Sequence, residues 1–278
     1  SGRPPGGAGT HRFRSPAIAL RALLALAALV TACDRTDFSS AWTTAAPLPE
    51  PLQEMHAAVL KETIYIAGGI DRQNAASRAA YRYDPGTDAW ERIADLPDGR
   101  HHMPLAVAND TLYAVGGLGP QGFNPVATLW LYEEATDRWV DRAQLPESRG
   151  ASGAGVLGGK IIVVGGFGSG GALLDSIAIY DPATNQWRRG TPMPTRRDHL
   201  SVATLGGRLF AIGGRPLDAD RNFAAIEMFS PLTESWLALP PMPTARGGLG
   251  AVGMGREIHV VGGETSSSVF SEHEAFDP

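Results

Sequence analysis

The stretch IIVVGGFGSGGALLDSIAIYDPATNQW, residues 161–187, contains the features that decide the fold. A run of β-branched residues ends in Gly165-Gly166, a polar and glycine-rich loop follows, and a second apolar run ends at Tyr180. A turn-type segment then leads to Trp187, seven residues after the tyrosine. Short apolar runs of this composition are typical of buried strands, and Pro, Asp and Asn between them are typical of hairpin turns. We therefore expect consecutive antiparallel strands here.

The same unit recurs five times along the chain, with a period of 48 or 49 residues. Its markers are a Leu-Pro or Met-Pro pair, a Gly-Gly pair 19 residues after that proline, and a tryptophan. The tryptophans are Trp42, Trp90, Trp139, Trp187 and Trp236. Three markers that share one period identify a repeat architecture rather than a chance pattern. The spacing varies only between the glycines and the next aromatic residue, so this segment is expected to be a loop.

Each repeat predicts four short strands and no helix. The first strand is expected after the proline, as in residues 102–108, and the second ends at Gly-Gly, as in residues 112–115. The third ends at an aromatic residue, as in residues 176–180, and the fourth begins at the tryptophan. Four strands in fewer than fifty residues, repeated without helical periodicity, are the pattern of an all-β propeller blade.

The Gly-Gly pair, the Tyr at the end of the third strand and the Trp seven residues later resemble the kelch repeat of the galactose oxidase and kelch superfamily. The resemblance covers residues 42–278 and implies a kelch β-propeller. We expect five four-stranded blades, with an N-terminal strand at Trp42 completing the last blade. A truncated six-bladed propeller is the alternative. Closure of this kind removes exposed strand edges.

The N-terminal residues are predicted to direct export rather than to fold. A basic segment precedes an apolar run, residues 17–30, that is too short to span a membrane, as in a secretory signal. It leads to Cys33, the one cysteine of the chain, in a context that resembles a bacterial lipobox. We therefore expect a lipoprotein signal peptide over 1–32, a lipidated Cys33 and tether over 33–41, and the propeller over 42–278. This predicts an exported protein, anchored in the bacterial cell envelope by lipid alone.

Composition excludes several classes of protein. Of 278 residues, 43% are apolar and 19% charged, which is sufficient for a folded core. One cysteine excludes an intramolecular disulfide, and the copper site of galactose oxidase, which needs a Tyr–Cys crosslink, is also excluded. Removing the four arginines of residues 1–32 from 24 basic residues leaves 20 against 29 acidic, a net charge of −9. This sign argues against nucleic acid as a partner.

The residues just after each repeat proline are the candidates for a ligand-binding site, because they enter the inner strands near the channel. An arginine stands three residues after the proline in four repeats, and Glu54, His102 and His199 stand five residues after it. His56 follows at seven. The arginines are Arg100, Arg149, Arg197 and Arg246. Odd offsets along a strand point to the same side, so all eight residues are expected to face the channel.

A ring of arginines suits carboxylate or phosphate recognition, whereas the structural alternative is that each arginine binds nearby carbonyls. Variable loops on the same face are expected to add side chains to the site. They include Asp71, Arg72, Phe123, Phe167, Arg215, Asp218, Asp220, Arg221 and Glu264.

Metal and nucleotide cofactors are not expected. His56, His101, His102 and His199 meet no metal-ligand spacing, and they would have to converge from different blades. The segment 166–171 matches GxGxxG by letter, but a strand rather than a helix is expected after it.

Two functions remain open. The first is a non-catalytic, monomeric module that binds an envelope protein or a glycan through the arginine-bearing face. The second is an acidic-sugar epimerase or mutarotase, because the architecture is similar to that of exported kelch proteins that epimerise N-acetylneuraminate. In that case Glu54, His102 or His199 would act as general acid or base.

Overall fold

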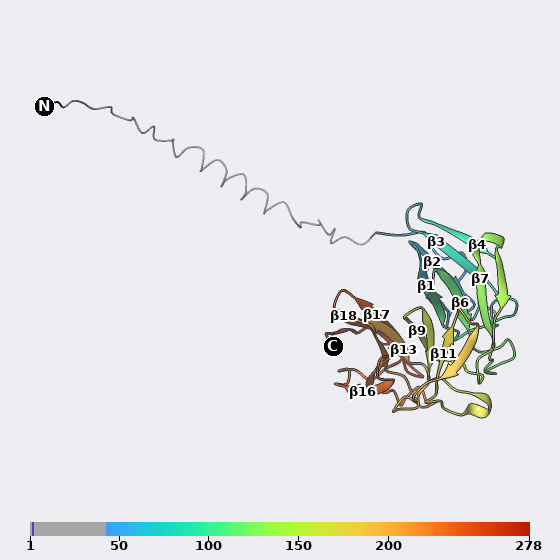
Figure 1. Cartoon of the computed structure of the whole chain (residues 1–278). Helices are drawn as coiled ribbons and strands as arrows, with labels where there is room; N and C mark the ends of the chain where they lie inside the picture. The colour runs from blue at the N-terminus through green and yellow to red at the C-terminus, as the bar shows by residue number, and fades with distance from the viewer. Residues whose placement is uncertain (1, 3–42) are drawn as a thin grey trace. The chain divides into compact units, whose positions relative to one another are not determined.

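The computed structural model describes residue 2 and residues 43–278, and residues 45–278 form one compact unit. This unit consists of five antiparallel sheets arranged as the blades of a β-propeller around a central channel, with consecutive blades following one another in chain order (Figure 1). The five-bladed all-β prediction is confirmed. Cys33, Trp42 and all but one residue of the predicted signal peptide lie outside the described residues.

Within each blade the strands run in order from the channel to the rim. Blade 1 contains β1 (His56–Leu60), β2 (Thr63–Ala67), β3 (Ala80–Asp84) and β4 (Ala89–Ile93). Blade 2 contains β5 (Leu105–Ala108), β6 (Thr111–Val115), β7 (Leu129–Glu133) and β8 (Arg138–Asp141). Blade 3 contains β9 (Gly153–Leu157), β10 (Lys160–Val164), β11 (Ile177–Asp181) and β12 (Gln186–Arg189). Blade 4 contains β13 (Ser201–Leu205), β14 (Arg208–Ile212), β15 (Ile226–Ser230) and β16 (Ser235–Leu239). Blade 5 contains β17 (Gly247–Met254), β18 (Glu257–Glu264) and β19 (His273–Phe276).

The hydrophobic core lies between blades rather than inside one sheet. Four clusters of buried side chains fill the four successive interfaces, each combining the second strand of one blade with strands of the next. The second strands supply the largest share, as Ile161, Val163 and Val164 show with no exposed surface. A strand that is buried on both faces reads as a continuous apolar run, which explains the runs seen before each Gly-Gly pair.

In blades 1 to 4 the tryptophan of the repeat binds the blade to the connection that enters it, and an aromatic residue of the third strand packs against it. In blade 2, Tyr132 and Trp139 pack with ring centroids 5.1 Å apart, and the Trp139 indole N–H donates to the Ala94 carbonyl at 2.9 Å. Asp137 accepts hydrogen bonds from the Tyr132 hydroxyl and from the Ala94 backbone N–H. Blade 1 repeats this arrangement with the Ala46 carbonyl. These aromatic residues are therefore structural.

The Gly-Gly pair is a point of close approach between consecutive blades. In blade 3 the Gly166 N–H donates to the carbonyl of Arg197, which enters blade 4, at 2.9 Å. A Cβ on Gly165 would lie 2.7 Å from that oxygen. Blades 1, 2 and 4 have the same link to the carbonyl of the next arginine. The pair is required because backbone, not a side chain, occupies this space.

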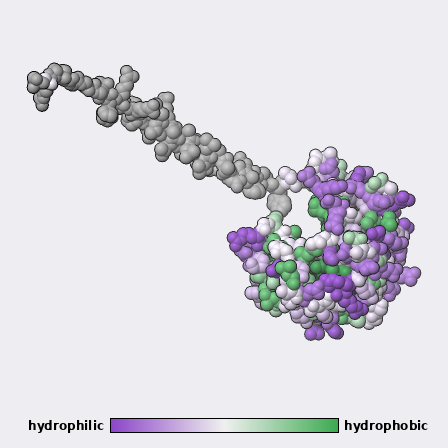
Figure 2. All heavy atoms as spheres, viewed as in Figure 1, coloured by the Kyte–Doolittle hydropathy of each residue, from purple (hydrophilic) through white to green (hydrophobic). Residues whose placement is uncertain are grey.

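The fifth blade has three strands within the described residues, and one of its faces is exposed. Val261 is 49% exposed, whereas its equivalents in the other four blades, Ala67, Val115, Val164 and Ile212, are at most 2% exposed. Val252 and Met254 on β17 are also exposed. Figure 2 shows that hydrophobic residues lie among hydrophilic ones on this side of the unit. The strand predicted to complete this blade begins at Trp42, outside the described residues. Within the part of the chain that the structure describes, no helix is long and apolar enough to cross a membrane.

Candidate functional site at the channel mouth

A belt of left-handed residues surrounds one end of the channel. The residue five positions after the repeat proline has φ between 49° and 65° in all five repeats. These residues are Glu54, His102, Ala151, His199 and Gly248. In blades 2 to 5 the backbone N–H of this residue donates to the carbonyl of the equivalent residue in the preceding blade, at 2.9–3.2 Å. Left-handed backbone is costly for a residue with a side chain, and such positions cluster at functional sites.

Two cavities meet at this belt. The channel cavity, of about 510 Å³, is lined by the entry segments and first strands of all five blades. The mouth cavity, of about 740 Å³, is lined by the loops between the second and third strands. Glu54, His102 and His199 line both cavities. The volume of the mouth cavity is that of a typical small-ligand site.

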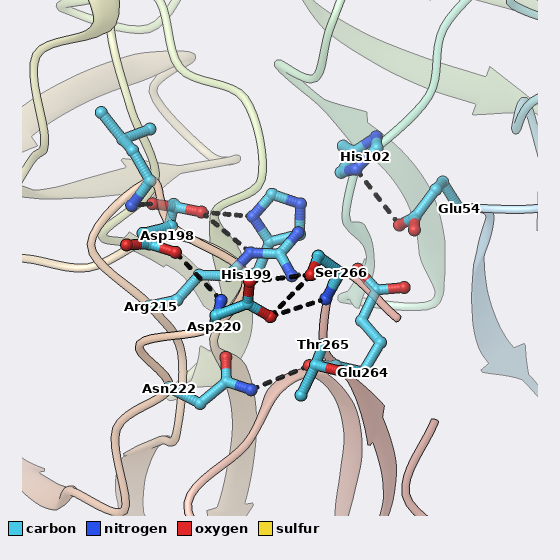
Figure 3. Close-up of polar contacts among 12 residues, drawn as sticks. Glu54, His102, Asp198, His199, Arg215, Asp220, Asn222, Glu264, Thr265 and Ser266 are labelled. Atoms are coloured by element: carbon cyan, nitrogen blue, oxygen red, sulfur yellow. Dashed lines mark hydrogen bonds and ion pairs between the residues drawn. The ribbon is translucent and has the colours of Figure 1, made fainter. Parts of the chain in front are cut away.

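Glu54 and His102 form the first polar contact of the mouth (Figure 3). The Nε2 of His102 lies 3.2 Å from Oε2 of Glu54, and its Nδ1 lies 2.6 Å from Nδ1 of His101. Desolvation, followed by the charges of His199 and His101, lowers the pKa of His102 to about 2. Desolvation also raises the pKa of Glu54, which the charge of His199 lowers and that of Glu264 raises. The lowered pKa keeps the His102 imidazole neutral, so its contact with Glu54 is not an ion pair.

His199, Asp198, Arg215 and Glu264 form the second polar group of the mouth (Figure 3). Nδ1 of His199 contacts Oδ1 of Asp198, whose other oxygen accepts the backbone N–H of Leu217 at 2.7 Å. The Arg215 guanidinium lies between two carboxylates, 3.8 Å from Asp198 and 3.0 Å from Glu264. His102 and His199 lie edge to face, with ring centroids 4.9 Å apart. The two polar groups are thus continuous across the channel.

The rim of the mouth is partly apolar. Phe123 is 66% exposed, and its ring packs edge-on against His101 and His102. Leu217 is 49% exposed and lines the same cavity. Asp220 in the blade 4 loop binds the hydroxyl and N–H of Ser266 in the blade 5 loop, which joins these two loops (Figure 3). An apolar side chain exposed over a polar cavity is suited to a ligand with both kinds of surface.

The structure brings together four of the predicted site residues. Glu54, His102 and His199 surround the mouth, and His56 lines the channel beneath them. Desolvation lowers the pKa of His56 to about 4. Among the described residues, no group of three or more histidine and carboxylate side chains is arranged to hold a metal ion.

The four predicted arginines are placed elsewhere, and this corrects their expected orientation. Each is at most 3% exposed, and none lines either cavity. Arg197 pairs with Glu227 at 2.7 Å and donates to two carbonyls, and Arg149 binds Glu147, Ser176 and the Gly165 carbonyl. Arg246 pairs with Glu274, and Arg100 stacks over Trp130 at 4.7 Å. Side chains two residues apart point to the same side only where the backbone is extended. The left-handed residue that stands two positions after each arginine breaks this alternation.

Asp198 is a further residue of the mouth that was not predicted. It is fully buried, follows Arg197 directly and orients His199. A carboxylate next to a histidine in the entry segment was the available signal. Its burial depends on the Leu217 loop, which no local pattern predicts.

Comparison with known proteins agrees with this architecture. A family model described as the KLHDC2/KLHL20/DRC7 Kelch-repeats domain matches residues 30–214, and a Kelch motif model matches residues 196–243. A solved structure described as "Structure of YjhT" is 22% identical, with a TM-score of 0.66, over 77% of this chain and 73% of that one. This likeness shows the fold. No curated protein matches the chain.

Proposed function

Because the chain belongs to the kelch-repeat family, we propose that it is a glycan-binding module whose ligand lies in the mouth cavity. The observation that carries the proposal is the convergence of Glu54, His102, His199 and Arg215 beneath the exposed ring of Phe123. Sugars present hydroxyl groups at their edges and C–H groups on their faces. A cavity with hydrogen-bonding side chains below and an aromatic ring at its rim complements both surfaces.

A thermal-shift screen of the full chain against monosaccharides and short glycans tests this proposal, with Cys33→Ser to prevent lipidation. A ligand at one hundred times its dissociation constant stabilises the protein by about 2.7 kcal/mol, or roughly 5–10 °C for a domain of this size. We expect such a shift, and we expect Phe123→Ala to abolish it. Leu232→Ala, which alters an exposed side chain outside both cavities, is the matched control.

A second candidate is a sugar mutarotase or epimerase that acts at the anomeric carbon, and the contact between Glu54 and His102 favours it. Ring opening requires a proton at the ring oxygen and loss of a proton from the anomeric hydroxyl, and a carboxyl with a raised pKa beside a neutral imidazole can exchange both. Saturation-transfer NMR between the two anomers is the test. Exchange faster than the uncatalysed rate, lost in Glu54→Gln, would support catalysis. Exchange at the uncatalysed rate would contradict catalysis and leave the binding function as the proposal.

We also propose that the module is exported and anchored in the envelope through a lipid on Cys33, with the propeller facing the periplasm or the exterior. The lipobox-like sequence before Cys33 supports this proposal. Metabolic labelling with a palmitate analogue should label the full chain, and Cys33→Ser should remove the label and release the protein into the soluble fraction. Membrane retention without Cys33 would contradict the anchor.

A further inference from the structure

The mouth cavity carries more negative charge than positive charge. Its ionisable lining consists of three carboxylates, those of Glu54, Asp198 and Glu264, one guanidinium, that of Arg215, and the imidazoles of His102 and His199. Because the four arginines after the repeat prolines are buried within their own blades, they add no positive charge to it. A negatively charged ligand would therefore meet repulsion where the sequence pattern predicted attraction.

The three carboxylates differ in how many of their oxygens remain available to bind a ligand. Asp198 has no exposed surface, and its oxygens are occupied by His199 and the Leu217 N–H. Glu264 is partly exposed, and its contact with Arg215 uses Oε1. Glu54 is partly exposed, and the one ion-pair-range contact that its carboxylate makes among the described residues is with Nε2 of neutral His102, at 3.2 Å. Glu54 and Glu264 thus present carboxylate oxygens from blades 1 and 5 to the same cavity (Figure 3).

A cation between Glu54 and Glu264 would relieve the repulsion between their carboxylates, because the charge of Glu264 raises the pKa of Glu54. Phe123 is the third residue of this site, beside Glu54 and Glu264. Its exposed aromatic face can attract both the C–H face of a sugar ring and a positive charge near it. Hydrogen bonds between an ammonium group and a carboxylate are about twice as strong as neutral ones.

We propose that the ligand is an amino sugar whose protonated amine lies between Glu54 and Glu264 while its ring packs on Phe123. This inference rests on the proposed glycan-binding function and specifies its ligand class. It replaces the acidic sugar suggested by the arginine pattern. Asp198 and Arg215 are positioning residues, because they orient His199 and Glu264.

Isothermal titration at pH 6.5 with glucosamine, N-acetylglucosamine and glucuronate tests the charge preference, because at this pH these sugars carry a positive charge, no charge and a negative charge, respectively. We expect glucosamine to bind at least about tenfold more tightly than glucuronate, with N-acetylglucosamine between them. Raising the salt concentration should weaken glucosamine binding more than N-acetylglucosamine binding.

Variants separate this inference from the proposed function. Glu54→Gln and Glu264→Gln should each weaken glucosamine binding about five- to tenfold and leave N-acetylglucosamine binding within about twofold. Glu62→Gln, an equal change of charge on an exposed turn of blade 1, should change neither. Equal affinity for all three sugars, or a preference for glucuronate, would overturn the amino-sugar inference and leave the glycan function intact. Binding of none of them, nor of any glycan in the thermal-shift screen, would overturn both.

Discussion

At the scale of the residue, the buried arginines are scaffold groups. Arg197 has no exposed surface, and its partner Glu227 is 3% exposed. Their ion pair, at 2.7 Å, lies within blade 4, while the Arg197 carbonyl receives the Gly166 N–H of blade 3. The same residue thus stabilises its own blade through its side chain and the preceding interface through its backbone. This explains its recurrence without a ligand.

Arg197→Met tests this role, because it leaves the Glu227 carboxylate buried without its partner. We expect a loss of about 3–5 kcal/mol in the free energy of unfolding, measured by urea denaturation. Arg188→Met is the matched control, since Arg188 pairs with Glu234 at the surface and should lose no more than about 1 kcal/mol. Equal effects of the two substitutions would contradict a buried structural pair.

The turn between β1 and β2 offers a second test at this scale. Lys61 has φ 47° there, whereas the equivalent positions in the other blades are Asn109, Gly158, Gly206 and Gly255. Glycine adopts this backbone without steric cost, and the exposed contact of Lys61 with Glu134 contributes little. Lys61→Gly should stabilise the protein by about 1 kcal/mol in urea denaturation.

Gly158→Ala is the reverse substitution. A Cβ at Gly158 meets no atom within 4 Å, so left-handed strain is the only added cost. We expect a loss of about 1–2 kcal/mol. Stabilisation by Gly158→Ala, or destabilisation by Lys61→Gly, would show that strain does not govern these turns.

At the scale of the element, the Gly-Gly pair at the end of each second strand lies close to backbone on two sides. In blade 3 a Cβ on Gly165 would meet the Arg197 carbonyl of the next blade, whereas a Cβ on Gly166 would meet the entry segment of its own blade. A Cβ on Gly166 would lie 2.5 Å from the Gly150 carbonyl oxygen and 2.9 Å from Cβ of Ser152. Both atoms belong to the entry segment of the same blade, beside the channel. The backbone there cannot move away without disturbing the belt at Ala151.

Gly166→Ala should therefore cost well above the roughly 1–2 kcal/mol of left-handed strain alone. Gly170→Ala isolates the strain, because Gly170 also has positive φ, 72°, and an added Cβ meets nothing within 4 Å. Thermal unfolding of both variants checks the difference. If Gly166→Ala were no worse than Gly170→Ala, close backbone approach would not explain the motif.

At the scale of the whole molecule, the burial of histidines around the channel makes stability depend on pH. Desolvation lowers the pKa of His56 to about 4 and that of His102 to about 2, below the ordinary value of 6.5. The unfolded chain binds these two protons more readily, so this stability is present above about pH 6.5 and is lost as the pH falls toward 4 and below. Glu54, which contacts His102, has a raised pKa, so its contribution to stability increases as the pH falls and opposes that of the histidines.

We expect the free energy of unfolding to fall by up to roughly 2.7 kcal/mol per pH unit between pH 6 and pH 4.5, the slope for two protons. His199, His101 and Arg215 also face His102, and their charges lower its pKa further. Urea denaturation at several pH values measures the slope. His56→Gln should reduce the slope by about half, and an unchanged slope in that variant would rule out His56 as a contributor.

Closure of the ring is the second prediction at this scale. Trp90 donates to the Ala46 carbonyl as Trp139 does to Ala94, so residue 46 has the register of a chain leaving a fourth strand. If the strand at Trp42 completes blade 5, Trp42→Ala should lower the melting temperature about as much as Trp90→Ala. A near-neutral Trp42→Ala, together with a destabilising Trp90→Ala, would contradict this closure.

The sequence by itself determined the strands, their order and the blade architecture, because these depend on short-range patterns that recur five times. The runs before Gly165-Gly166, the turn after Tyr180 and the packing of Trp187 follow from local composition and spacing. It also predicted that Glu54, His102 and His199 lie at the channel, where they line both cavities.

Only the tertiary structure decided which charges reach the cavity. The left-handed backbone at His199 turns it toward the channel while Arg197, two residues before, is directed into the blade. The burial of Asp198 and the pairing of Arg215 with Glu264 join segments far apart in the chain. Side-chain direction at an irregular entry segment depends on backbone torsions and neighbouring blades, which residue spacing does not encode.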